Sequence, residues 1–423
     1  MELRKLLWLP DWRGTDLQTQ EELKMKKQVV SVLLTAAMAT GMLAGCGSST
    51  TATSSAASSS STAAASSTAA ASSSSAAEES TSSSSTAAVS SASTEAVKST
   101  SAAASTGKAD GTYALVPKSA GNPFNEREAD GFTQAVEAMG GTAVVNYPDQ
   151  ATADAQITVI QSLISQGVDS IAVAANDANA LSAALQQAKD AGIAVCTLDS
   201  DVNAADRAVF CNQAGVQEIG QALMDAVLDI SGGEGQYAIL SATSQATNQN
   251  AWIDAMKQIA ASDDKYSKLE LVEVAYGDDE PQKSTDQTQA LLTKYPDLKV
   301  ICSPTTVGIA AAAKVLQDQG SSVKLTGLGL PSEMKEYIGD DDAHSCPYMF
   351  LWNPIDLGKL AGYTSIALAN GTITGAEGET FEAGDLEGSP YTITANSDGA
   401  TEIILGQPFK FDPSNIEEWA EVY

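Results

Sequence analysis

Basic residues are scarce in this sequence. Its 423 residues include 23 Lys and Arg against 53 Asp and Glu, and the formal net charge is −30 at pH 7. Phosphate backbones and anionic headgroups repel a chain of this charge. We therefore exclude nucleic acid as a partner and a basic patch as a membrane contact, and we interpret the acidity as a source of solubility.

Histidine and the common catalytic motifs are also scarce or absent. His344 is the one histidine, no Ser or Cys stands in a nucleophile-elbow motif, and no glycine-rich loop matches a phosphate-binding pattern. The acidic run 340–342 lacks the alternating spacing and the downstream Glu of a calcium loop, and no other group of residues has metal-ligand spacing. We predict a protein that is not an enzyme and that uses no metal and no cofactor.

A short apolar stretch near the N-terminus ends at Cys46. Residues 25–45 begin with Met-Lys-Lys, continue with an apolar run that is short for a membrane span, and end with small residues. These are features of a secretory signal, and its ending Leu-Ala-Gly-Cys resembles the bacterial lipoprotein box. The resemblance implies that Cys46 becomes a lipidated N-terminus, which holds the protein at the membrane outside the cytoplasm. An ordinary signal peptide followed by a chance cysteine is the alternative.

Two segments around this signal contribute nothing to the predicted fold. Residues 1–24 are charged and irregular and precede a better start at Met25, so we interpret them as an upstream extension from a mis-assigned start. Residues 46–108 are Cys46 followed almost entirely by Ser, Thr and Ala, with too few large apolar groups to offset the entropy of ordering. We predict a disordered tether that holds the next domain a few nanometres from the membrane, as a spacer through a Gram-positive cell wall would. Drifted low-complexity sequence is the alternative, and it is equally unfolded.

Four further cysteines leave the disulfide state open. An even number in an exported protein permits disulfides. Cys196 and Cys302, however, lie in apolar runs typical of strands, where buried free thiols are more common. The sequence alone does not pair these two with Cys211 or Cys346.

From about residue 109 short apolar runs alternate with helical patterns, and the series restarts near residue 213. Runs such as 170–175 are almost continuously apolar, which is typical of strands buried on both faces of a parallel sheet. We predict an α/β fold of two Rossmann-like lobes, each with a parallel sheet flanked by helices, joined by crossover hinge strands. The first lobe is expected to comprise residues 109–212 and 354–402, and the second 213–353 and 403–423.

Polar residues follow many of the predicted strands. Ligands of open parallel sheets bind at the carboxyl ends of the strands, and there the sequence places Lys, Asp, Asn, Gln and Thr together with a Phe and a Trp. Groups that donate and accept in several directions, beside an aromatic ring, suit a small polyhydroxy ligand.

Several stretches at these loops resemble the type I periplasmic binding proteins of sugar ABC transporters. The similarity is strongest to the rhamnose-binding branch and its relatives, the autoinducer-2 receptors. The stretches follow one another in order over residues 111–370: GNPFNEREADGF, IAVAANDANAL, LDSD, ILSATSQATNQNAWIDAMK, YGDD, LLTKYPDLKVICSPTTVG, TGLGLPSEMKEYI and LWNPIDLGK.

The resemblance implies a role for individual residues. Lys118 would reach ligand hydroxyls, Phe124 would stack on the sugar ring, and Asp199 would accept two hydroxyl hydrogens. Asn248 and Gln249 would supply amides from the second lobe. The remaining residues of the predicted site line its wall, close it near the hinge or neighbour it in the same loops: Asn122, Asp201, Pro304, Thr306, Trp352 and Asn353.

Four of these residues also have a purely structural interpretation. Lys118 would then be a solvated loop lysine, Asp199 a turn or helix-capping residue, Asn248 a helix N-cap and Trp352 a core residue. The resemblance favours the ligand-binding interpretation for all four.

Two positions bear on the choice of ligand. The autoinducer-2 receptors carry Asp at the position of Asn248, whereas Thr-Asn-Gln-Asn at 247–250 is similar to the rhamnose-binding relatives. Asn125 stands where relatives often have a second Phe, which reduces ring stacking. We therefore expect a monomeric binding protein that delivers rhamnose or a similar monosaccharide to an ABC permease. A receptor for autoinducer-2 is the alternative, and a sugar sensor for chemotaxis or signalling is a more distant one.

Overall fold

The computed structural model describes residues 110–396 and 399–423. The predicted upstream extension, signal, lipidated Cys46 and tether lie outside these residues. Among the described residues, no helix combines the length and the hydrophobicity that a membrane span needs.

The first lobe is built on a seven-stranded sheet with the strand order β13-β14-β5-β4-β3-β1-β2. All neighbouring strands run parallel except the edge strand β13, which is antiparallel to β14. The strands are β1 (Thr112–Val116), β2 (Thr142–Val145), β3 (Ser170–Val173), β4 (Ala194–Leu198), β5 (Phe210–Ala214), β13 (Thr394–Ala395) and β14 (Thr401–Gly406).

Helices cover both faces of this sheet. Side chains from α2 (Pro123–Ala138) and α10 (Pro354–Ala369) share one apolar cluster, and those from α3 (Ala153–Gln166) and α4 (Ser182–Asp190) form the other with the opposite strand faces. This is the doubly wound arrangement that the alternating sequence pattern predicts.

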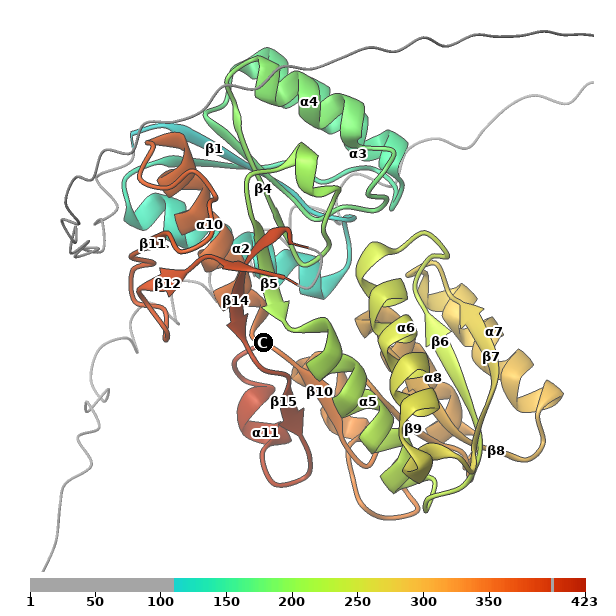
Figure 1. The fold of residues 1–423 in the computed structure, drawn as a ribbon. Coiled ribbons are helices and arrows are strands. Elements are labelled where there is room, and N and C mark those ends of the chain that lie inside the picture. Colours follow the sequence, from blue (N-terminus) through green and yellow to red (C-terminus); the bar gives the residue numbers. More distant parts are fainter. Residues whose placement is uncertain (1–109, 397–398) are drawn as a thin grey trace, which may run out of the picture. The chain divides into compact units, whose positions relative to one another are not determined.

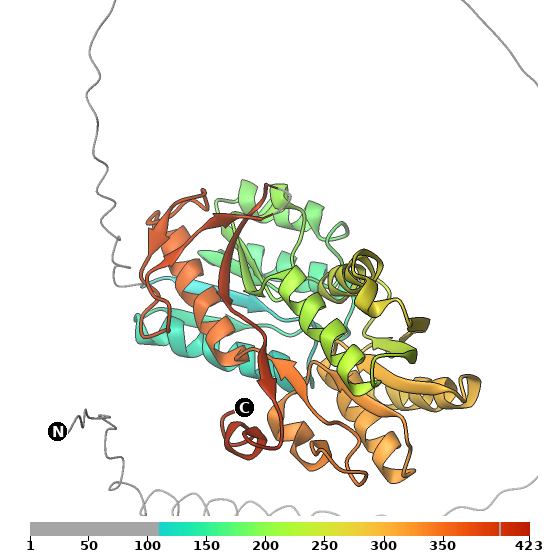
Figure 2. The same cartoon turned by 60° about the horizontal axis from the view of Figure 1, so that its bottom comes forward.

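Two glycines allow α2 and α10 to lie unusually close together. A Cβ at Gly131 would lie 1.9 Å from the Ile355 carbonyl oxygen, and one at Gly358 would lie 1.9 Å from that of Glu128. No other residue fits at either position without separating the helices. Figure 1 and Figure 2 both show this pair side by side, although more than 200 residues separate them in the sequence.

The second lobe contains a four-stranded parallel sheet with the order β7-β6-β8-β9. Helix α5 packs against α6, and α7 packs against α8. The strands are β6 (Gly235–Ser241), β7 (Leu269–Tyr276), β8 (Leu298–Ser303) and β9 (Lys324–Gly327), and the helices are α5 (Val216–Ile230), α6 (Thr247–Ser262), α7 (Pro281–Lys294), α8 (Thr306–Asp318) and the short α9 (Pro331–Met334).

Short elements complete the chain. Strand β10 (Met349–Leu351) pairs antiparallel with β15 (Phe409–Phe411), and β11 (Thr380–Phe381) pairs with β12 (Tyr391–Thr392). The chain ends with the single turn α11 (Ile416–Trp419). The 3₁₀ turns are 204–206, 264–266 and 335–337.

Among the described residues, the chain passes between the two sheets after β5, between β10 and α10, and after β14 (Figure 1). The sequence prediction ended the first lobe at residues 212 and 402, whereas the sheet includes residues up to Ala214 and Gly406. The difference arises because β14 pairs with β5, a contact between residues far apart in sequence that local pattern does not reveal.

All four described cysteines are free and buried, including Cys346. Burial raises the pKa of the Cys302 thiol to about 12, so it remains protonated and behaves as a small apolar group.

Candidate functional site

The loop after β1 supplies the first group of polar residues. Asn122 caps α2, because its Oδ1 accepts a hydrogen bond from the Phe124 backbone N–H at 3.0 Å, and Pro123 occupies the first helical position. This cap fixes the start of the helix, so Phe124 and Lys118 line the same small space between the lobes. Lys118 is buried rather than solvated, since its side chain points inward between the lobes.

Asp199 follows β4 and lies next to Lys118. Its φ of 56° places it in the left-handed region, and the residue is buried. The carboxylate accepts hydrogen bonds from Asn248 Nδ2 at 3.1 Å to each oxygen and from Gln213 Nε2 at 3.3 Å. Lys118 Nζ lies 3.5 Å away. Burial raises the pKa of Asp199 above its ordinary value, and the Lys118 charge opposes this shift.

The second lobe contributes the first turns of α6 and α8. Lys118 Nζ donates to Asn248 Oδ1 at 2.7 Å and to Gln249 Oε1 at 3.4 Å. Thr306 Oγ1 lies 3.4 Å from Asn122 Oδ1 of the first lobe. The N-cap position of α6 is Ala246, so Asn248 is not the capping residue of that helix. Polar side chains of the two lobes therefore hydrogen-bond directly to one another at the carboxyl ends of both sheets.

An aromatic wall borders these contacts. The rings of Phe124 and Trp352 pack edge to face with their centroids 6.2 Å apart, and the centroids of the Trp252 and Trp352 rings are 5.6 Å apart. Trp352 is buried, and its indole Nε1 has no hydrogen-bond partner within the described part of the chain. A buried donor without a partner costs free energy, and here it borders the polar cluster.

The space left between the lobes at this point is small. It amounts to about 30 Å³, enough for about two water molecules. Pro304 and Thr306 line it opposite Lys118 and Asp199. A larger guest fits only when the lobes separate and its own polar groups replace the direct contacts.

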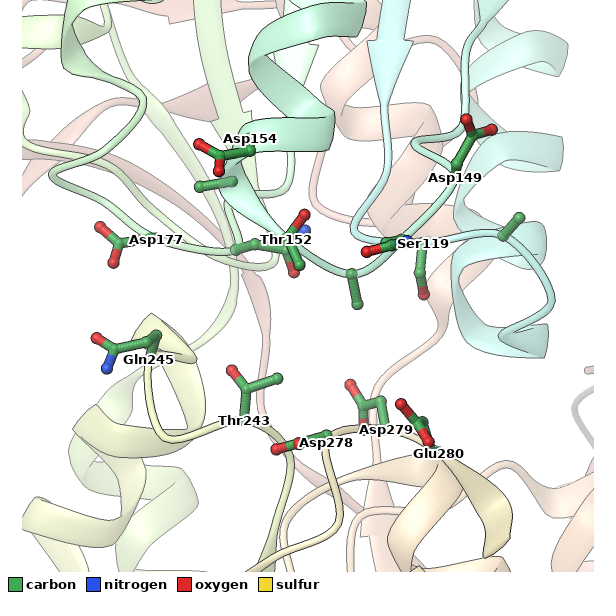
Figure 3. A pocket seen from close by; sticks show the side chains of 15 residues that line it. Ser119, Asp149, Thr152, Asp154, Asp177, Thr243, Gln245, Asp278, Asp279 and Glu280 are labelled. Atoms are coloured by element: carbon green, nitrogen blue, oxygen red, sulfur yellow. The ribbon is translucent and has the colours of Figure 1, made fainter. Parts of the chain in front are cut away.

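A wider, acidic cleft of about 630 Å³ lies outside this space, and Figure 3 shows its residues facing one another from the two lobes. Asp279 borders both the cleft and the inner space. Burial raises the pKa of Asp279, and Thr305 Oγ1 donates a hydrogen bond to its carboxyl. The acidic residues of the cleft are Asp149, Asp154, Asp177, Asp278, Asp279 and Glu280.

The structure does not bring two of the predicted site residues, Asp201 and Asn353, into this cluster. Asp201 pairs with Arg207, whose Nε and Nη2 lie 2.7 and 2.5 Å from its two oxygens, and also accepts from Thr197 Oγ1 at 2.6 Å. Asn353 caps α10, accepting from the Ile355 backbone N–H at 2.9 Å. Both side chains are already engaged in holding the backbone.

Two residues that the sequence prediction did not include belong to the surroundings of Asp199. Gln213, on β5, donates to it. Glu128 is 1% exposed, and no hydrogen bond reaches its Oε1 from the described residues. Burial raises the pKa of Glu128 well above its ordinary value, the nearby Asp199 charge raises it further, and Lys118 lowers it. Glu128 follows Phe124 by four residues and therefore shares its face of α2, a signal that could have identified it.

A family model described as "Periplasmic binding protein domain" matches residues 113–373. A D-apiose import binding protein of Actinobacillus succinogenes is 26% identical over 232 residues, which cover 55% of this chain and 72% of that protein.

Solved structures are also similar. An ABC transporter solute binding protein from Clostridium phytofermentas with bound L-rhamnose is 63% identical, with a TM-score of 0.73, and the match covers 74% of this chain and 99% of that one. LsrB from Clostridium saccharobutylicum in complex with AI-2 is 23% identical, with a TM-score of 0.66 and coverage of 73% and 99%. At that identity the likeness concerns the fold alone.

Proposed function

We propose, from the premise that this chain belongs to the periplasmic binding protein family, that it is the solute-binding protein of a sugar ABC transporter. In this role it captures a monosaccharide between its lobes, and we infer that the sugar is L-rhamnose or a close analogue. One observation carries the proposal: Lys118 and Asp199 of the first lobe meet Asn248 and Gln249 of the second at the strand ends of both sheets.

The same side chains explain how a sugar would hold the lobes together. Asp199 can accept two hydroxyl hydrogens, Lys118 can donate to hydroxyl oxygens, and the two amides can do both. Hydrogen bonds to neutral groups contribute about 1 kcal/mol each and those to charged groups about 1.5–3 kcal/mol, because water is displaced on both sides. A guest bridging the two lobes therefore replaces the direct contacts and favours closure.

The aromatic wall suits the apolar face and the methyl group of a deoxy sugar. Phe124 and Trp352 offer ring edges and faces, and the unpaired Trp352 N–H supplies a further donor for a hydroxyl. The protein of 63% identity holds L-rhamnose, which supports this choice.

Asn248 supports rhamnose over autoinducer-2. Its Nδ2 donates to both oxygens of Asp199. An Asp at this position, as in the autoinducer-2 receptors, would place a second carboxyl against Asp199 and change the pattern of donors.

Calorimetric titration of the purified protein with L-rhamnose, its epimers, D-ribose, D-apiose and autoinducer-2 tests the assignment. We expect L-rhamnose to bind tightest, with micromolar or better affinity. Tighter binding of autoinducer-2 than of any sugar would refute the ligand assignment.

The location of the protein is a second part of the proposal. We propose that Cys46 is lipidated, that the Ser/Thr/Ala segment acts as a tether, and that the monomeric binding domain works without catalysis at a Gram-positive cell surface, where it docks on an ABC permease. Cys46→Ala should release the protein from the membrane fraction into the medium, as an immunoblot would detect. Equal retention of the variant would contradict lipid anchoring.

A further inference from the structure

The side chain of Gln213 forms hydrogen bonds with both the main chain and the side chain of Asp199. Its Nε2 donates to the Asp199 backbone oxygen at 3.1 Å and to Oδ1 at 3.3 Å. Both partners are acceptors, so the nitrogen of the amide must face them. Gln213 is 1% exposed and does not line the space between the lobes, so it acts on Asp199 rather than on a guest.

Asp199 is a residue that requires such support. Its φ of 56° lies in the left-handed region, which residues with a Cβ adopt seldom, although Asp and Asn do so more often than most. Its carboxylate is buried, and burial disfavours the charged form that accepts hydroxyl hydrogens best. A neutral amide that donates to the carboxylate favours this form without adding charge.

The support from Gln213 differs from that of Asn248 in one respect. Asn248 belongs to the second lobe, and its bonds to Asp199 are lost when the lobes separate. Gln213 lies on β5 and Asp199 directly follows β4, two neighbouring strands of the first-lobe sheet, so we expect their bonds to persist in the open protein. Gln213 also lies three residues before Val216, where α5 of the second lobe begins, and so ties Asp199 to the first crossover.

We propose that Gln213 is a positioning residue for ligand capture. Before a sugar binds, it keeps the Asp199 carboxylate ionised and oriented toward the small space between the lobes. This inference rests on the proposed function, because it assumes that Asp199 accepts sugar hydroxyls. A preformed acceptor needs no rearrangement on binding, and this lowers the cost of capture.

Calorimetry with L-rhamnose on the wild type, Gln213→Met and Asn212→Leu tests the inference. Met has the length of Gln without its donor. Asn212 is the matched control, since it is the buried neighbour on β5 and its Nδ2 donates to Glu402 at 2.8 Å instead. We expect Gln213→Met to weaken binding at least about tenfold, the range of a hydrogen bond to a charged group, and Asn212→Leu to change it less than about twofold.

The pH profile of the affinity separates positioning from space filling. Lys118, Glu128 and Asp279 surround Asp199 in both proteins, so a difference between wild type and Gln213→Met isolates the amide. On acidification, binding by Gln213→Met should fail at a higher pH than binding by the wild type. If Gln213→Met does not fold, Gln213→Glu keeps the shape, and we expect it to lose at least about tenfold at pH 7.

The outcomes distinguish the two proposals. Wild-type affinity in Gln213→Met, or an identical pH profile, overturns the inference alone. A wild-type protein that binds no sugar of the panel overturns the proposed function and the inference with it.

Discussion

Replacing Asp199 by Asn should strongly weaken the affinity for the sugar while leaving the ligand-free fold intact. The amide keeps the shape but loses the charge and one acceptor oxygen. If two hydroxyls donate to the carboxylate, removing one bond to a charged group and weakening the other costs about 3 kcal/mol, or roughly a hundredfold in Kd. Burial raises the pKa of Asp199, so its ionisation disfavours folding. Losing the charge therefore offsets the lost ion pair with Lys118, and we expect the free energy of unfolding to change by less than about 1 kcal/mol.

Asp201→Asn is the control, because it should behave in the opposite way. Its carboxylate faces Arg207 rather than the cleft, and Arg207 is buried. Breaking this pair should lower the melting temperature by a few degrees and leave sugar affinity within about twofold of the wild type. Calorimetry and thermal unfolding, run on both variants, give the four values. Unchanged affinity in Asp199→Asn, or a large loss in Asp201→Asn, would refute the assignment of roles.

Three further predictions concern the surroundings of the site. The pKa of Glu128 is raised, so above the ordinary Glu pKa the folded protein keeps a proton that the unfolded chain releases, and the stability from this group falls as pH rises. Glu128→Gln should therefore be at least as stable as the wild type at pH 7, with a flatter profile of melting temperature against pH, and a marked loss of stability would contradict the raised pKa of Glu128. Trp352→Phe keeps an aromatic ring but removes the unpaired N–H, and we expect calorimetry to show about a 3- to 30-fold weaker affinity for the sugar, with little change in melting temperature. Equal affinity would show that the indole nitrogen does not contact the sugar. Gly358→Ala would place a Cβ 1.9 Å from the Glu128 carbonyl oxygen and should cost about 1–3 kcal/mol in a denaturant titration, whereas wild-type stability would show that α2 and α10 separate freely.

The sequence predicted the fold because the fold depends on local pattern, whereas the individual residues of the candidate site were taken from the resemblance to sugar-binding proteins. Apolar strands that alternate with helices define a parallel sheet, and a ligand cleft lies at the carboxyl ends of such strands. Lys118, Asp199 and Asn248 each follow or begin an element at that edge. The structure accordingly brings them within hydrogen-bonding distance or ion-pair distance of one another.

The remaining features depend on the direction of individual side chains and on long-range pairing. Asp201 lies two residues from Asp199, and only the position of Arg207 decides that it turns away. Asn353 adjoins Trp352 but is used as a helix cap. Gln213 reaches Asp199 from a neighbouring strand, and β14 joins the first sheet across almost 190 residues, so no local pattern could identify either contact.

The close contact between α2 and α10 determines which aromatic residues travel together. Phe124 lies in the first turn of α2, and Trp352 lies in the crossover segment that leads from β10 into α10. Because the two helices pack tightly and the two rings are in contact, we expect both rings to stay with the first lobe. Trp252 belongs to α6 of the other lobe. Separation of the lobes should therefore break the contact between Trp252 and Trp352 and keep the contact between Phe124 and Trp352. Intrinsic tryptophan fluorescence should then report the opening of the lobes.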